Sequence, residues 1–301
     1  MHTRHRHRRD SLPRLRHAAL IALVIGAPLA AQERIDHRWP LDADGMVRIY
    51  NFNGTVRITG WSRDSVVVTG TTEVFRGFFG GGTTKALKFG VEEAIKGPTP
   101  RSELTVFLPA RARLWVRGAS TDVEVRDVAG VVDVGVVSGR VRVSGSPAEV
   151  YAETMDGDLE VEASPSYFRG KTATGRLTWT GGGDDVTLAT VSGAITVAGG
   201  RLLRARIESI TGDIRYTGSL KPGANVTFDT HAGDVWLTLA KDTAGELSVD
   251  APFGSVLGKI YKGQGGSPVL IALPRSGTVS LDQGVTITAR SFKGRVVVVQ
   301  Q

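Results

Sequence analysis

The sequence predicts an all-β protein: a parallel β-solenoid with coils of about 18 residues, two strands per coil, and a cap at each end. Three observations support this prediction. Glycines recur at a nearly fixed interval, apolar and polar residues alternate on both sides of each glycine, and helical spacing of apolar residues is absent. In a solenoid each coil buries its apolar face only against its neighbours, so a short fixed period is its signature.

Six glycines define the period between residues 121 and 239, at intervals of 18, 18, 18, 19 and 21 residues, and Thr121 holds the equivalent place one interval earlier. After each glycine, polar and apolar residues alternate as in a half-buried strand, which predicts that Leu159, Leu177 and Ile195 point inward. A second alternating segment lies five to seven residues before the glycine. In most repeats a Ser or Thr lies three residues before it. The glycines are Gly139, Gly157, Gly175, Gly193, Gly212 and Gly233.

Charged residues at the outward positions alternate in sign from one repeat to the next. If equivalent residues of adjacent parallel strands lie about 4.8 Å apart, each acid has a base as its direct neighbour. The alternation therefore predicts ion pairs between successive repeats that help to fix their register. The two columns are Asp122, Arg140, Asp158 and Arg176, and Glu124, Arg142 and Glu160.

Residues 1–32 have the features of a secretory signal peptide, because a basic start is followed by an apolar run, Ala18 to Ala31, that is too short to span a bilayer. Residues 33–301 are then expected to form one domain. Within it, residues 33–120 form N-terminal coils and a cap with an insertion at 71–100, residues 121–239 form the regular repeats, and residues 240–301 form C-terminal coils and a cap. Residues 83–97 fit a strand or a short helix, and the strand is preferred. The apolar strand Arg295–Val299 is expected to close the second end.

The composition limits the kinds of partner that the protein is expected to bind and the compartments in which it is expected to be found. Loss of the signal peptide removes six of the 37 basic and one of the 30 acidic residues, so the formal charge falls from +7 to +2. Such a balanced surface argues against nucleic-acid binding. There is no cysteine, which excludes disulfides, and no later apolar stretch is long enough for a transmembrane segment. The expected location is the periplasm, the outer surface or the extracellular space.

Three motifs together resemble the bacterial putative-adhesin family of unknown function. They are Asn53–Trp61 near the mature start, Leu108-Pro109 before a strand, and the repeated (Ser/Thr/Asp)-Gly-x-(Ile/Val/Leu)-x-(Val/Tyr/Trp). The resemblance covers roughly residues 46–281. It implies a secreted, periplasmic or surface β-solenoid, and it brings no catalytic residues with it.

The expected function is an exported, non-enzymatic interaction module of the envelope or cell surface, whose partner is a glycan or an envelope protein. One alternative is a carbohydrate-active enzyme, because Asp213 and Asp234 hold equivalent positions in adjacent repeats and could approach the roughly 5–5.5 Å separation of a retaining glycosidase. The other is a structural or envelope-stress protein without a ligand. No catalytic triad, phosphate-binding loop or dinucleotide fingerprint is present.

The candidate binding residues are aromatic. Trp236 falls in an outward column beside Arg215 and offers a stacking platform, unless later residues fold over it. Phe78 and Phe79 interrupt a glycine-rich stretch and either latch onto an end coil or mark a docking patch. No metal or cofactor is expected, because His37 and His231 are the only histidines outside the signal peptide. His231 occupies the position held in other repeats by Val137, Met155, Val191 and Ile210.

Overall fold

The computed structural model describes residues 32–73, 77–92, 99–261, 268–271, 275–280 and 284–301. In these residues the protein is all-β, and its strands join into one large, mostly parallel sheet of 23 strands. The expected signal peptide lies outside the described residues except for Gln32. Within the described ranges, no helix has the length and apolar character needed to cross a bilayer.

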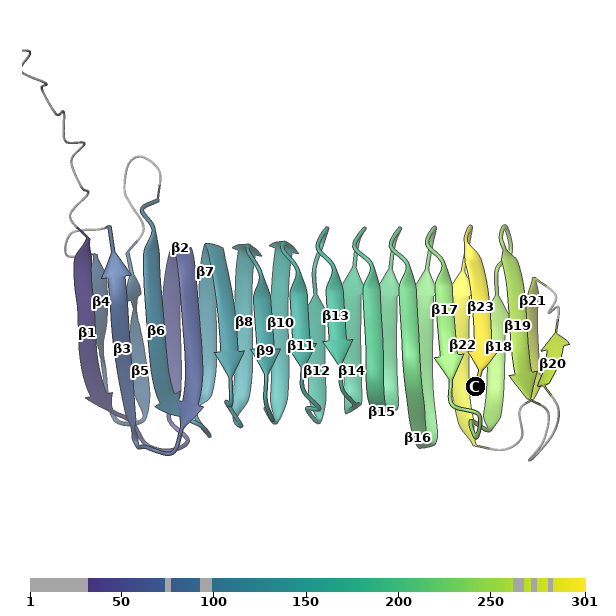
Figure 1. Cartoon of the computed structure of the whole chain (residues 1–301), viewed down its shortest axis with the longest axis horizontal. Coiled ribbons are helices and arrows are strands. Elements are labelled where there is room, and N and C mark those ends of the chain that lie inside the picture. Colours follow the sequence, from purple (N-terminus) through teal and green to yellow (C-terminus); the bar gives the residue numbers. More distant parts are fainter. Residues whose placement is uncertain (1–31, 74–76, 93–98, 262–267, 272–274, 281–283) are drawn as a thin grey trace, which may run out of the picture. The chain divides into compact units, whose positions relative to one another are not determined.

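Figure 1 shows the strands side by side, from β1 and β4 at one end to β20 and β21 at the other. The strands of the N-terminal part are β1 (Glu33–Pro40), β2 (Met46–Trp61), β3 (Ser65–Thr72), β4 (Phe78–Gly82), β5 (Ala86–Val91), β6 (Ser102–Pro109) and β7 (Arg113–Arg126). The strands of the regular repeats are β8 (Val131–Ser138), β9 (Val141–Ser144), β10 (Glu149–Asp156), β11 (Leu159–Glu162), β12 (Tyr167–Lys171), β13 (Leu177–Thr180), β14 (Gly183–Thr190), β15 (Ile195–Ser209), β16 (Ile214–Thr230) and β17 (Val235–Leu239). The C-terminal strands are β18 (Gly245–Asp250), β19 (Ser255–Tyr261), β20 (Pro268–Ile271), β21 (Ser276–Ser280), β22 (Val285–Ser291) and β23 (Arg295–Gln300).

The pairings arrange the strands in two rows, which we name after β8 and β9. The β8 row runs in the order β4, β5, β2, β7, β8, β10, β12, β14, β15, β16, β22, β18 and β21. The β9 row runs in the order β1, β3, β6, β2, β7, β9, β11, β13, β15, β16, β17, β23, β19 and β20. The long strands β2, β7, β15 and β16 take part in both rows. Among the strands that the structure describes, antiparallel pairs occur only near the two ends.

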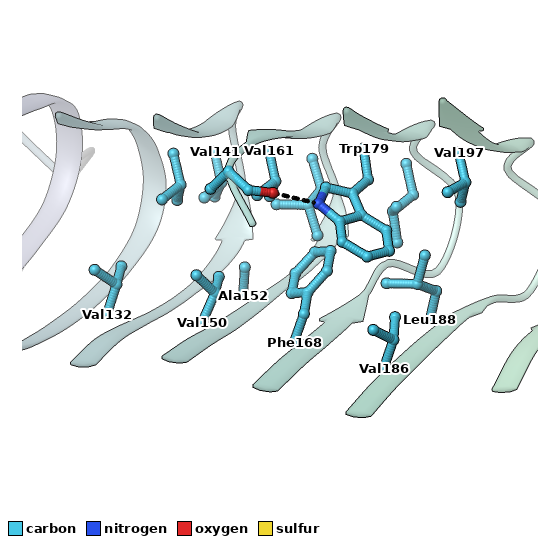
Figure 2. Close-up of a cluster of buried hydrophobic side chains, with 14 of the residues drawn as sticks. Val132, Val141, Val150, Ala152, Val161, Phe168, Trp179, Val186, Leu188 and Val197 are labelled. Carbon is cyan, nitrogen blue, oxygen red and sulfur yellow. Dashed lines mark hydrogen bonds between the residues drawn. The ribbon is translucent and has the colours of Figure 1, made fainter. Parts of the chain in front are cut away.

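Apolar side chains from both rows meet in the core (Figure 2). Val132, Val150 and Phe168 project from the β8 row toward Val141, Val161 and Trp179 of the β9 row. The predicted inward column is confirmed, because Leu159 pairs with Leu177 and Leu177 with Ile195, and all three are buried. Trp179 is completely buried and donates its indole N–H to the Ala163 carbonyl at 2.9 Å. The buried indole therefore keeps a hydrogen-bond partner, as burial of a polar group requires.

The recurring glycines mark the place where neighbouring backbones come closest. A Cβ atom on Gly175 would lie 1.8 Å from the Gly157 carbonyl oxygen, and one on Gly193 would lie 1.8 Å from the Gly175 oxygen. No side chain fits there, so the period reflects close backbone approach, and at Gly139 a positive φ of 117° favours glycine as well. The buried hydroxyl three residues earlier stabilises the corner. Thr172 Oγ1, for example, accepts from the Gly175 N–H at 3.1 Å and donates to the Gly157 carbonyl at 3.2 Å.

The alternating charges lie next to one another as predicted. Arg142 forms a salt bridge with Glu160 at 2.6 Å across 18 residues of sequence. Asp158 accepts a hydrogen bond from the Arg176 backbone N–H at 2.9 Å and lies 3.8 Å from its guanidinium group. Glu124 differs, because it pairs with Arg126 of its own strand. The ion pairs in these columns are consistent with the parallel register of the strands. They add little to the free energy of unfolding, because exposed salt bridges contribute little.

The two ends are finished by strands outside the repeat pattern. At the N-terminal end Trp39 of β1 stacks on the buried Phe89 with ring centroids 5.8 Å apart. Residues 86–91 form a strand, in agreement with the prediction for that segment, although residues 93–97 lie outside the described part. Arg295–Val299 forms a paired strand, as expected, but the expectation that it closes the second end is wrong, because β23 pairs with β17 on one side and β19 on the other. The last strand is therefore internal to the sheet, and β20 and β21 lie beyond it.

Candidate functional site

Aromatic side chains gather on the outward face of the β8 row near the N-terminal end. In β2 and β7, Val47 and Ile49, and Leu114 and Val116, are buried, so the residues between and after them point outward. The parallel register then aligns successive outward residues into columns, with Arg48 beside Trp115 and Tyr50 beside Arg117. We call this surface the aromatic face; its half-buried aromatic residues are Tyr50, Phe79, Trp115, Tyr151 and Tyr167.

Tyr50 and Trp115 form the centre of the aromatic face. Their ring centroids lie 5.2 Å apart in an edge-to-face arrangement, and Phe79 lies 6.3 Å from Tyr50. Two cations hold the rings. The Lys88 ammonium group lies 4.9 Å from the Tyr50 ring, and the Arg117 guanidinium group lies 4.1 Å from the Trp115 ring. These contacts restrict the rings before any ligand arrives, which lowers the entropic cost of binding.

A groove of about 380 Å³ opens on this face. The two cationic residues of its lining, Arg48 and Arg113, are exposed, while the carboxylate of Asp133 is held by Arg117 at 2.9 Å. Because the single acid of the lining is already neutralised, the groove presents a positive charge beside aromatic surface. The lining residues are Met46, Arg48, Tyr50, Arg113, Leu114, Trp115, Val131 and Asp133.

The aromatic face continues along the row beyond the groove. Tyr151 and Tyr167 lie with their ring centroids 5.1 Å apart, and the Tyr151 hydroxyl donates to Glu149 at 3.1 Å. Partial burial, followed by this hydrogen bond, raises the pKa of Tyr151. Its hydroxyl therefore stays protonated at neutral pH and acts as a hydrogen-bond donor.

Phe78 and Phe79 lie on opposite sides of β4. Phe78 packs against the core and stacks on His37, with ring centroids 4.9 Å apart, at the end covered by β1. Phe79 lies near Tyr50 and the Lys88 ammonium group. Phe78 therefore packs over the end, as the first alternative predicts, and Phe79 belongs to the aromatic face; its role in docking stays a prediction.

Trp236 and Arg215 are direct neighbours in β17 and β16, as their equivalent positions predict. Arg215 is engaged by Asp213 at 2.9 Å, however, and the guanidinium group that lies over the Trp236 ring, at 5.4 Å, belongs to Arg295 of β23. The indole is half-buried, and its N–H is buried without an acceptor among the described residues. Trp115 lines a groove, whereas Trp236 is absent from the lining of that groove and of the larger groove on the β9 row.

The carboxylates of Asp213 and Asp234 are both occupied. Asp213 accepts from the backbone N–H of Asp234 at 3.0 Å, and Asp234 accepts from the Arg295 guanidinium group at 2.6 and 3.0 Å. Partial burial raises the pKa of Asp234, but the hydrogen bonds and charge of Arg295 outweigh it and leave this pKa below its usual value. A glycosidase general acid needs a raised pKa, so Asp234 does not suit that role, and the salt bridges of Asp213 to Arg215 and of Asp234 to Arg295 leave neither carboxylate free for a substrate.

A second groove, of about 560 Å³, lies over the charged columns of the β9 row. Its walls include Asp122, Arg140, Arg142 and Asp158, whose charges alternate and largely compensate one another. It lacks aromatic residues and is the weaker candidate for a binding site. Within the described ranges, no three His, Asp or Glu side chains gather as a metal site would require.

The sequence does contain the signal for the aromatic face, although reasoning from the repeat period does not reach it. Residues 46–50 and 113–117 lie before Thr121, where the 18-residue rhythm cannot assign neighbours. Alternation alone places Tyr50 and Trp115 outward, but only the observed pairing of β2 with β7 brings them together.

Comparison with known proteins gives likeness of structure only. No protein-family model matches the chain, and no curated protein matches its sequence. A putative adhesin from Parabacteroides merdae is 12% identical, with 88% of this chain and 96% of that chain covered and a TM-score of 0.44. A putative adhesin from Bacteroides fragilis is 11% identical, with 90% and 99% covered and a TM-score of 0.41.

A putative cell adhesion protein from Clostridium sporogenes is 11% identical, with 89% of this chain and all of that chain covered and a TM-score of 0.23. The resemblance drawn from the glycine motifs is confirmed to this extent: the structural neighbours are bacterial putative adhesins. Identities this low carry no inference about ligand or partner.

Proposed function

We propose that the protein is an exported, non-enzymatic interaction module of the cell envelope or surface, built as one β-solenoid domain over residues 33–301 with coils of about 18 residues. Support for the solenoid comes from hydrogen bonds that join residues 18 positions apart, such as Arg142 to Glu160. The caps are β1 and β4 at one end and β20 and β21 at the other. Exposed charges on β1, including Arg34, Asp36 and Arg38, protect that edge from pairing with another chain.

The ligand we propose is an acidic glycan, bound on the aromatic face. The observation that carries this proposal is the Tyr50–Trp115 pair, whose rings line an open groove and are held by Lys88 and Arg117. Aromatic rings present flat apolar surface to the C–H faces of sugar rings, and Tyr and Trp combine this surface with a polar group. The exposed Arg48 and Arg113 supply charge that complements carboxylate, sulfate or phosphate groups on the glycan.

The test is binding of the purified chain to oligouronates, measured by isothermal titration calorimetry, with cello-oligosaccharides as the neutral comparison. Trp115→Ala is expected to weaken oligouronate binding at least about tenfold, the usual loss when a central aromatic residue is truncated. The matched control is Trp236→Ala, which removes the same ring near the other end of the sheet and is expected to retain binding. Loss of binding in Trp236→Ala but not in Trp115→Ala would overturn the assignment and favour the site predicted from sequence.

The alternatives give different outcomes in the same assay. A carbohydrate-active enzyme would release shortened products from the glycan, and Asp213→Asn would abolish this release. A structural protein without a ligand would bind neither class of oligosaccharide. Intact oligouronates, recovered after binding that depends on Trp115, are the expected result.

A further inference from the structure

A line of exposed, mostly apolar side chains runs along one corner of the sheet. Seven of them lie two residues before Gly139, Gly157, Gly175, Gly193, Gly212, Gly233 and Gly294, and the last, Phe253, lies one residue before Gly254. Soluble proteins scatter exposed apolar residues singly, but here they follow one another in adjacent strands. We call this line the ridge. It consists of Val137, Met155, Ala173, Val191, Ile210, His231, Phe292 and Phe253, in spatial order.

Backbone hydrogen bonds show that the ridge is continuous. The N–H of Val191 donates to the Ala173 carbonyl at 3.1 Å, and the N–H of His231 donates to the Ile210 carbonyl at 3.1 Å. At the far end the rings stack: His231 lies 4.8 Å from Phe292, and Phe292 lies 4.8 Å from Phe253, measured between ring centroids. The ridge and the aromatic face share no residue, because the ridge lies at the corner and the aromatic face on the outward side of the β8 row.

The exposed area is too large to be incidental. Six ridge residues are 40–70% exposed: Phe292 40%, Val191 48%, Val137 51%, Ile210 52%, Met155 57% and Phe253 70%. Together they present apolar surface on the order of 500 Å², at the upper end of what a soluble monomer shows. Two such surfaces facing each other would remove about 1,000 Å² from water, which reaches the lower limit for a specific interface.

The charges beside the ridge indicate what covers it. The adjoining column, one residue before each glycine, contains two charged side chains, Asp156 and Lys293; its other members are Ser138, Thr174, Ser192, Thr211, Ala232 and Phe253, whose ring packs on Phe292 and so joins the ridge. Asp156 lies beside the second ridge residue, Met155, and Lys293 beside the seventh, Phe292. Reversing the ridge end for end therefore exchanges the acid and the base, and it also places Val191 opposite Ile210.

We propose that a second copy of this chain covers the ridge, in an antiparallel dimer. Its two-fold axis lies in the interface, perpendicular to the ridge, and crosses it between Val191 and Ile210. Asp156 of each copy then meets Lys293 of the other, and Met155 meets Phe292, a favourable sulfur–aromatic contact. A parallel arrangement of the two ridges would place the charged columns on opposite sides and lose both ion pairs. The dimer leaves both aromatic faces open, so it doubles the valency for a polymeric ligand.

The test is sedimentation velocity on the purified chain from about 1 µM to about 1 mM, the range in which an interface of this size associates. The expected result is a concentration-dependent dimer. Asp156→Lys and Lys293→Asp should each raise the dissociation constant about tenfold, because each change replaces two attractions with two repulsions. The double variant Asp156→Lys/Lys293→Asp should restore the dissociation constant to within about threefold of the original.

Two further variants separate association from folding. Ile210→Glu places a charge at the centre of the interface and should abolish the dimer, while its melting temperature stays near that of the original chain because the side chain is half exposed. The matched control, Thr178→Glu, changes an outward residue of the β9 row away from the ridge and should leave the dimer intact. A chain that stays monomeric at about 1 mM, or a double variant as weak as its two parents, would overturn the antiparallel dimer. So would a monomer that binds neutral lipid vesicles through the ridge.

Discussion

Substitution of one recurring glycine offers a direct test of how closely neighbouring strands approach. In Gly175→Ala the new Cβ atom would lie 1.8 Å from the Gly157 carbonyl oxygen and 2.4 Å from its carbon. A normal contact needs at least about 3.2 Å, so the two backbones would have to separate by more than 1 Å. The atoms in conflict belong to the backbone, so no rotation of a side chain can relieve them.

Such a separation breaks the hydrogen bonds that flank the glycine. The N–H groups of Ala173 and Thr174 both donate to the Met155 carbonyl, at 3.1 and 3.0 Å, and Thr172 Oγ1 donates to the Gly157 carbonyl at 3.2 Å. At about 1 kcal/mol for each bond, Gly175→Ala is expected to lower the free energy of unfolding by about 3 kcal/mol or more. The measurement is urea unfolding followed by far-ultraviolet circular dichroism.

Gly81→Ala is the matched control. No atom lies within 4 Å of the Cβ position at Gly81, which is exposed in β4. The expected effect is a stabilisation of a few tenths of a kcal/mol, because alanine restricts the unfolded chain. If both variants unfold at the same urea concentration, steric exclusion does not explain the glycine period.

Three more substitutions test the core and the charge network. Ile195→Asp puts a carboxylate into a completely buried position and should unfold the regular repeats. Arg142→Ser removes a partly exposed side chain and should leave the urea midpoint almost unchanged. A native-like melting curve for Ile195→Asp would contradict the inward assignment of this residue. Asp234→Asn should lower stability at pH 7 by no more than about 1 kcal/mol. Because the pKa of Asp234 is lowered by folding, its contribution is present above the unfolded-state pKa and is lost as the pH falls through the folded-state pKa. Urea midpoints of the original chain and Asp234→Asn should therefore converge as the pH falls below the usual range of a carboxyl pKa, and a gap that persists in acid while the chain is still folded would refute the ion-pair explanation.

The regular repeats are predictable from sequence because period and alternation specify the same arrangement. The interval of 18 residues gives the neighbour of each strand, and alternation gives the side on which each residue lies, as at Leu177. The charge columns provide a third, independent check, and Arg142 with Glu160 confirms it. Three local patterns thus agree on one fold, which is what a well-specified sequence provides.

Outside the repeats, period and alternation do not indicate which distant strands pair with one another. Tyr50 and Trp115 meet because β2 pairs with β7 across about 65 residues of chain, and no interval in the sequence reports that pairing. Trp236 shows a related difficulty. Alternation places its side chain outward, but Arg295, which covers the ring, arrives from a strand far along the chain. Contacts of high sequence separation depend on topology, which alternation does not encode.

The position of β22 and β23 affects how the protein can be made and altered. These strands come last in the chain, yet β22 joins β16 to β18, and β23 joins β17 to β19. A ribosome therefore releases β16 to β19 before the residues that connect them exist, and the sheet stays divided until β22 and β23 have been made. Deleting residues 285–301 would split the remaining strands into two parts with newly exposed edges, whereas removal of β20 and β21 would only shorten one end.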